Sequence, residues 1–205
     1  MTNRSQFLAR LRPIRPGHAR IGLLPEVAYG GVGEADFRRR WEALGGVLHV
    51  CRPAELPATI TSIAGDRGPV LIGADELVRD LPGDLRWPEC GIAGAAAAGI
   101  AVVGGVAAVA ATASVVLDSR VAHGRSAALL APVAVFVVPR SQLVTSPSEI
   151  LRRTRARWPE GLPSQLVFVS GPSRSADIEM TLTRGVHGPG EVHLILLDDP
   201  GSPAG

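Results

Sequence analysis

Lysine is absent from this 205-residue chain, so every fixed side-chain cation is an arginine. The absence excludes a Schiff-base lysine, the lysine of a phosphate-binding P-loop and a serine–lysine dyad. Cysteine is nearly absent as well, because the chain holds only Cys51 and Cys90, far apart in the sequence. Two isolated thiols cannot hold an iron–sulfur cluster or a structural zinc by themselves, so we expect no cofactor in this chain.

Aromatic residues make up only 4% of the chain, and the formal net charge is only +2. Few aromatic rings and a weak electrostatic field argue against nucleic acid as a partner. Residues 1–15 lack the apolar run of a secretory leader. Together with the two lone thiols, this indicates a reducing compartment, and we expect a cytoplasmic protein.

Residues 91–117 carry no charge and are numerous enough to span a bilayer. They consist mostly of alanine and glycine and contain little of the leucine, isoleucine and phenylalanine on which membrane insertion depends. We therefore expect no membrane span and interpret the run as a buried part of an α/β core.

Helix-like and strand-like stretches alternate along the chain, which is typical of βαβ units. The pattern predicts an α/β fold with a mostly parallel sheet and helices on both of its faces. We expect one domain over residues 1–199, with a leading helix within residues 1–15 and a flexible tail at 200–205. The expected helices are residues 4–11, 34–44, 54–64, 75–80 and 148–157, with a helical turn at 106–111. The expected strands are residues 47–51, 69–72, 91–97, 114–117, 132–138, 166–170 and 192–198.

A polar turn after the second-last expected strand offers groups that suit an anion. Ser173 or Ser175 can cap a helix expected over residues 176–182, and Arg174 adds a cation. Free backbone N–H groups, two hydroxyls and a guanidinium beside the carboxyl end of a strand can hold a carboxylate or a phosphate. Alternatively, the serines only cap the helix, and Asp177 only complements its dipole.

Two further loops contain candidate residues. His187 and Gly188 lie in a glycine-rich turn before the last expected strand, where the imidazole can act as a general base or can hydrogen-bond a loop carbonyl. Residues 118–125, a loop that ends at Arg125, follow another expected strand. Such a loop is either part of a binding site or a solvated surface turn.

The order and spacing of residues 171–198 resemble the signature of the LUD domain, the lactate utilization protein C family. The similarity extends more thinly over residues 70–199. It implies a fold like that of ribose-phosphate isomerases, glucosamine-phosphate deaminases and CoA transferases. It also implies a component of a system that oxidises lactate to pyruvate, in which iron–sulfur partner proteins carry the electrons.

The resemblance also suggests roles for particular residues. Ser173, Arg174 and His187 would bind or orient a small anionic ligand, with Thr112 and Ser114 opposite them.

The chain departs from the family pattern at two places. The family usually has Ala–Glu–Thr–Gly–Ser/Thr before a strand, where this chain has Ala111 in place of the glutamate and Ala113 in place of the glycine. The family usually has a histidine where this chain has Val133. If the missing groups form an acid–base pair, the chain is inactive or altered in its chemistry; if they only shape the fold, little is lost.

Three classes of function follow, and whether the chain is an enzyme stays open. The first is a non-redox component or accessory of lactate utilization. The second is an independent enzyme that acts on a phospho-sugar or an acyl-CoA, although fold similarity alone is a weak argument for it. The third is a diverged, non-catalytic binding or assembly protein on the same scaffold, which the alanine and valine replacements favour.

Overall fold

A computed structural model describes residues 32–123, 125–176, 182–185 and 187–199 of the chain. The helix expected at residues 4–11, the tail at 200–205 and Asp177 lie outside these described residues.

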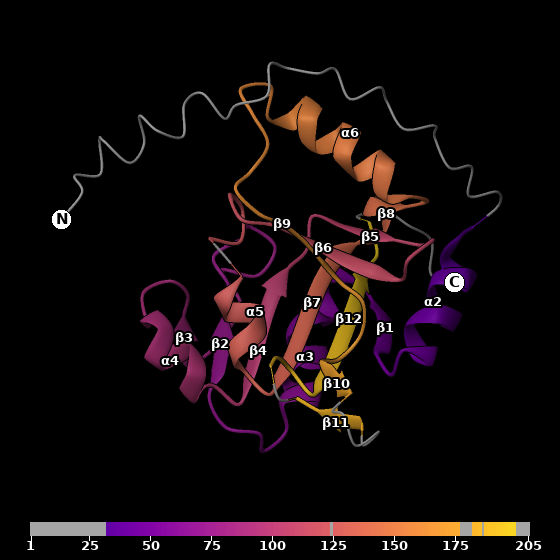
Figure 1. Cartoon of the computed structure of the whole chain (residues 1–205). Coiled ribbons are helices and arrows are strands. Elements are labelled where there is room, and N and C mark those ends of the chain that lie inside the picture. The colour runs from indigo at the N-terminus through magenta and orange to yellow at the C-terminus, as the bar shows by residue number, and fades with distance from the viewer. Residues whose placement is uncertain (1–31, 124, 177–181, 186, 200–205) are drawn as a thin grey trace.

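A six-stranded sheet in which all the strands are parallel forms the centre of the molecule (Figure 1). Its spatial order is β1-β12-β7-β4-β2-β3. The strands are β1 (Val47–Cys51), β2 (Val70–Ile72), β3 (Leu85–Arg86), β4 (Ile100–Gly104), β7 (Val133–Pro139) and β12 (Glu191–Leu197). The central strand β4 is buried along its whole length, as is typical of a parallel strand covered on both faces.

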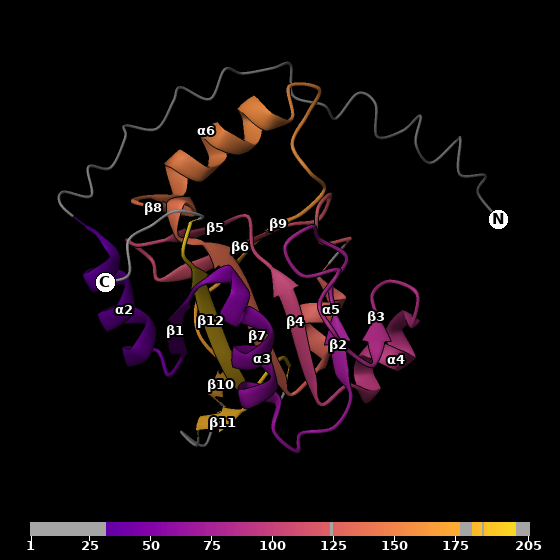
Figure 2. The same ribbon diagram turned by 180° about the vertical axis from the view of Figure 1, so that it is seen from behind.

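Helices cover both faces of this sheet. The short helix η2 (Pro53–Glu55) leads into α3 (Leu56–Ala64), which lies against one face (Figure 2). The opposite face packs against α2 (Glu34–Ala43), α4 (Gly91–Ala97) and α5 (Ser126–Leu130). Strand β7 serves both cores by alternation: Val135 and Val137 face α3, whereas Phe136 and Val138 face the other way.

A second, four-stranded sheet has the order β8-β5-β6-β9 and lies beside α6, at the top of Figure 1. It is built from β5 (Ala107–Val109), β6 (Ser114–Asp118), β8 (Leu143–Val144) and β9 (Leu166–Val169). The chain enters β8 through η3 (Arg140–Gln142), and α6 spans Pro147–Arg157. Val109 and Val116 pack with Ile150 of α6, whereas Val115 and Leu117 join the main core. The sheet thus connects α6 to the parallel sheet.

The structure confirms the α/β fold with a mostly parallel sheet flanked by helices, and it corrects four of the expected elements. Residues 91–97 form the helix α4 rather than a strand, in keeping with the high helix propensity of alanine. Residues 106–111 contain strand β5 rather than a helical turn, and residues 75–80 form turns rather than a helix.

The prediction of a helix over residues 176–182 is also wrong, because the first and the last of these residues lie in strands. Ala176 closes β10 (Arg174–Ala176) and pairs with Leu182, which opens β11 (Leu182–Arg184). The two strands are antiparallel, so Ser173 does not cap a helix. Among the described residues, no helix is long and apolar enough to cross a lipid bilayer.

Candidate functional site

A cavity of about 510 Å³ opens where three neighbouring strands of the parallel sheet end. Ligands of open α/β sheets bind at this carboxyl edge. The segments that line it follow β2, β4 and β7, and two further walls come from the loop after β6 and from the end of α6. The lining residues are Ala74, Asp75, Glu76, Leu77, Arg79, Gly104, Gly105, Val106, Arg120, Val121, His123, Pro139, Gln142, Arg157 and Trp158.

Asp75 is a buried carboxylate on the wall of this cavity, with only 4% of its surface exposed. Its Oδ2 accepts a hydrogen bond from the Gly104 backbone N–H at 2.7 Å, and its Oδ1 accepts one from the Leu77 N–H at 3.2 Å. Burial raises the pKa of Asp75, although these backbone donors partly oppose the shift. The fold therefore holds a hydrogen-bonding carboxyl group where a ligand can reach it.

Gly104 makes room for that carboxylate. A β-carbon at this position would lie 1.9 Å from Asp75 Oδ1, far inside van der Waals contact. Strand β4 must therefore end in glycine for Asp75 to occupy its place and to receive the Gly104 N–H.

Cationic side chains also line the cavity. Arg120 forms an ion pair with Glu160 at 2.5 Å, and its guanidinium carbon lies 4.8 Å from the centre of the Trp158 ring. Arg157 lies 5.3 Å from the same ring and is exposed. Among the described residues, no carboxylate lies within ion-pair distance of Arg157, so its charge is available to an anion.

Asp118 fixes the two walls that carry these arginines. Its side chain is 2% exposed; one oxygen accepts the Trp158 Nε1–H at 2.9 Å and the other accepts the Arg120 N–H at 2.8 Å. His123, on the same loop, has a left-handed backbone with φ +50°, and its carbonyl accepts the Trp87 Nε1–H at 3.0 Å. The imidazole of His123 is exposed on the cavity wall.

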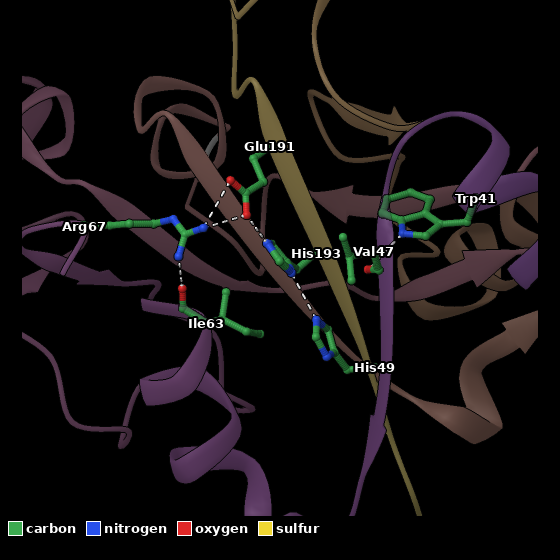
Figure 3. A network of polar contacts seen from close by, with 7 residues as sticks. All are labelled: Trp41, Val47, His49, Ile63, Arg67, Glu191 and His193. Carbon is green, nitrogen blue, oxygen red and sulfur yellow. Dashed lines mark hydrogen bonds and ion pairs between the residues drawn. The ribbon is translucent and has the colours of Figure 1, made fainter. Parts of the chain in front are cut away.

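A second polar cluster lies on the α3 face of the sheet, at its β1–β12 border (Figure 3). His49 Nε2 is 3.0 Å from His193 Nδ1, and His193 Nε2 is 2.7 Å from Glu191 Oε1. Glu191 also forms an ion pair with Arg67 at 3.0 Å, and the Arg67 guanidinium donates a hydrogen bond to the Ile63 carbonyl at the end of α3. The chain of contacts ties two strands and a helix together, and no residue of it lines the cavity.

The tautomers of this cluster follow from the charge of Glu191. The hydrogen bond from His193, together with the charge of Arg67, lowers the pKa of Glu191, so the carboxylate is ionised and His193 Nε2 carries the hydrogen. With the hydrogen on Nε2, His193 Nδ1 faces His49 Nε2 as the acceptor of its N–H. Burial and the neighbouring His193 lower the pKa of His49.

Comparison with known proteins decides the family. A model of the LUD domain matches residues 92–197, which is more than half of the chain. The chain belongs to the LUD domain family. The matched range includes Gly104, Arg120, His123 and Arg157, whereas Asp75 precedes it.

Three curated relatives of this LUD domain are named lactate utilization protein C. The one from Shouchella clausii is 45% identical over 87 residues, which are 42% of this chain and 38% of that protein. The one from Bacillus subtilis is 43% identical over 89 residues, 42% of this chain and 37% of that protein. The one from Bacillus licheniformis is 35% identical over 153 residues, 64% of this chain and 63% of that protein. In each case the match spans less than two thirds of the relative.

A solved structure supports the fold over a longer range. A DUF162 family protein from Deinococcus radiodurans superposes with a TM-score of 0.62 at 25% identity. The match covers 80% of this chain and 94% of that one, so most of the LUD fold described above is shared.

The structure brings part of the predicted site together. Ser114 Oγ lies 2.8 Å from Thr112 Oγ1 and 2.7 Å from Ser170 Oγ, so a chain of hydroxyls reaches the start of the polar turn. Within that turn the Ser173 N–H donates to the Pro189 carbonyl at 2.8 Å. A β-carbon at Gly188 would lie 3.3 Å from Ser173 Cβ, so the two loops are in contact.

The charged members of the predicted set point elsewhere. The Arg174 guanidinium donates to the Leu44 carbonyl, and both Arg174 and His187 are exposed. Ser175 lies in β10, paired with Thr183 of β11, and Arg125 is exposed at the start of α5. None of these described residues lines the cavity at the carboxyl edge.

Sequence reasoning missed Asp75, Arg79, Arg157 and Trp158 as site residues, whereas Arg120 and His123 belong to the loop 118–125 that it considered. One signal pointed to Asp75: it comes three residues after an apolar strand, Val70–Ile72, at the edge where ligands bind. Nothing local points to Arg157, because only the fold carries the end of α6 to that edge.

Proposed function

We propose that this LUD domain is a non-redox component of a lactate utilization system and that its cavity binds a small organic-acid anion. The cavity supports this proposal because it combines exposed cationic groups, Arg157 above all, with a buried carboxylate at a sheet edge suited to ligands. The relatives named lactate utilization protein C support the biological setting. In this proposal iron–sulfur partner proteins carry the electrons, since Cys51 and Cys90 are isolated from each other in the sequence.

Deletion of the gene, followed by growth on lactate as sole carbon source, tests the biological role. We expect slow growth that an intact copy restores, and normal growth on a second carbon source such as glucose. Normal growth on lactate, in a strain without a second copy of the gene, would refute the proposed role.

The turn at Ser173 and Arg174 stays a second candidate for the anion site, favoured by its contact with the Gly188 loop. The two candidates share no residue, so single variants separate them. If the turn binds the anion, Arg174→Gln weakens the binding of lactate and Arg157→Gln leaves it unchanged. If the cavity binds it, the outcomes are reversed.

A further inference from the structure

Trp158 lies against two of the arginines that line the cavity. The guanidinium carbon of Arg120 is 4.8 Å from the centre of the Trp158 ring, that of Arg157 is 5.3 Å from it, and all three residues belong to the lining. We infer that Trp158 is a positioning residue that holds Arg120 and Arg157 as a pair, and that the pair binds one anion. The inference rests on the proposed anion site and adds to it the residue that orders its cationic groups.

The indole ring attracts both guanidinium groups through the negative face of its π system, and tryptophan is the aromatic residue that does this best. Two cations beside one ring also repel each other. An anion bound between them relieves that repulsion and keeps the attraction of each guanidinium to the ring. The pair is therefore a better site for an anion than either arginine alone.

A buried carboxylate holds the ring in place. The Trp158 Nε1–H donates to Asp118 Oδ2 at 2.9 Å, and Asp118 is only 2% exposed. The other oxygen, Oδ1, accepts the Arg120 backbone N–H at 2.8 Å. One carboxylate thus fixes both the ring and the backbone of an arginine that stacks on it. Loss of either bond would leave a buried polar group unpaired, so the arrangement allows few orientations of the ring.

Arg120 keeps donors available for a ligand although it already has partners. One guanidinium nitrogen forms the ion pair with Glu160, and the other donates to the Leu162 carbonyl at 3.5 Å. A guanidinium carries five N–H donors, so these contacts leave others free. The Glu160 side chain is 63% exposed, and an ion pair this accessible to water is weak. A ligand carboxylate can therefore share Arg120 with Glu160 or displace it.

Stacking on the ring lowers the cost of binding an anion. A long side chain that becomes immobilised only when the ligand arrives reduces the affinity by the conformational entropy that it loses. Arg120 and Arg157 already lie beside the ring in the chain without a ligand. Removal of the ring should leave both charges in the protein but make each arginine lose its freedom on binding.

Calorimetric titration of the full chain and its variants with lactate at pH 7.5 tests the inference. We expect Trp158→Leu to weaken the binding about tenfold, the factor for two arginines that must be ordered by the ligand. Trp158→Phe keeps a ring but loses the bond to Asp118, so it should restore most of the affinity and remain within about threefold of the unaltered chain. Leu151→Ala is the control, since Leu151 is an exposed leucine of the same helix outside the cavity lining, and it should change the affinity less than twofold.

Acrylamide quenching of tryptophan emission gives a readout that a purely structural role would not move. The chain has three tryptophans, and Trp41 and Trp87 are 0% and 8% exposed, so the half-buried Trp158 is the indole that acrylamide reaches most easily. Saturating lactate should reduce the quenching of the unaltered chain and leave that of Trp158→Phe unchanged, because the bound anion lies beside Trp158.

Two kinds of result separate this inference from the site on which it rests. Equal affinities of Trp158→Leu and the unaltered chain, equal losses in Trp158→Leu and Trp158→Phe, or quenching that lactate does not change would overturn the inference and leave the anion site standing. Failure of the unaltered chain to bind lactate would overturn the anion site and the inference with it. If urea unfolding shows that Trp158→Leu does not fold, quenching of the unaltered chain and of Trp158→Phe still decides.

Discussion

Asp75 and Gly104 share a space that leaves no room for a β-carbon. The Asp75 carboxylate lies against the Gly104 backbone, accepts its N–H at 2.7 Å and is almost completely buried. A carboxylate in that position is sustained by the donors around it, so any change that removes them leaves a buried polar group without partners.

Gly104→Ala should therefore destabilise the fold by at least about 2 kcal/mol, because the new methyl group forces Asp75 away from its donors. Gly33→Ala is the control, since nothing lies within 4 Å of a β-carbon there, and it should cost under about 1 kcal/mol. Denaturant unfolding measures both. Equal costs for the two variants would show that the Asp75 contact contributes nothing.

Ala113 occupies a backbone conformation that glycine adopts more readily. Its φ is +47°, and it stands where the LUD pattern usually has glycine. A left-handed conformation costs an alanine about 1–2 kcal/mol, so this residue keeps its place because the loop around it fixes the backbone. Arg40 contributes to that loop by donating to the Ala111 carbonyl.

Ala113→Gly should leave the stability unchanged or raise it, because relief of the backbone strain offsets the lost methyl group. Ala110→Gly is the matched control, since Ala110 is equally buried and has a negative φ. It should cost about 1–2 kcal/mol through the lost apolar contact and the flexibility of glycine. Urea unfolding of the two variants checks the difference, and a larger loss for Ala113→Gly would contradict it.

At the scale of elements, the edge strand β1 is held to β12 by more than its ladder of backbone hydrogen bonds. His49 of β1 forms a hydrogen bond with His193 of β12, and His193 forms one with Glu191. Arg67, which follows α3, forms an ion pair with Glu191 (Figure 3). His193 is therefore the titratable group that lies against His49, and Glu191 and Arg67 follow it in the chain of contacts.

The lowered pKa of His49 predicts a dependence of stability on pH. A group whose folded pKa lies below its unfolded value of about 6.5 binds more protons when the chain unfolds, so its contribution is complete above that value and is lost as the pH falls. The free energy of unfolding should decrease as the pH falls below about 6.5. His49→Gln should flatten this slope in urea unfolding between pH 5 and 8, and an unchanged slope would contradict the role of His49.

The sequence predicted elements well where the apolar pattern is decisive. The strands at 47–51, 132–138 and 192–198 coincide with β1, β7 and β12 within one residue, because runs of valine, leucine and isoleucine suit buried parallel strands. The helix at 34–44 coincides with α2 for a similar reason: its charged and apolar residues follow the helical period.

The local sequence pattern did not predict the elements correctly where the apolar residues have no period. It also failed where pairing with a distant segment decides the secondary structure. Residues 91–111 are almost all alanine, glycine and valine, so helix α4 and strands β4 and β5 differ only in what they pack against. The turn at Ser173 was expected to lead into a helix, but β10 and β11 pair with each other instead. The cavity required the whole fold, because its walls come from segments far apart in the sequence.

At the scale of the molecule, segments that follow strands of both sheets line the cavity. The parallel sheet supplies Asp75 and Gly104, while the loop after β6 and the end of α6 supply Arg120 and Arg157. The buried carboxylate of Asp118 accepts hydrogen bonds from the Trp158 indole and from the Arg120 backbone, so it fixes the two segments that carry the arginines. An anion bound there contacts both parts, so its binding should raise the midpoint of thermal unfolding.

The most direct test of this account is the affinity of lactate for the full chain and for Arg157→Gln, measured by calorimetric titration. Arg155→Gln is the control, because Arg155 is an exposed arginine in the last turn of the same helix and does not line the cavity. We predict that Arg157→Gln weakens the binding about tenfold, the loss expected for one charged contact, and that Arg155→Gln changes it less than twofold. Equal effects of the two variants, or a loss confined to Arg174→Gln, would contradict the placement of the anion site in this cavity.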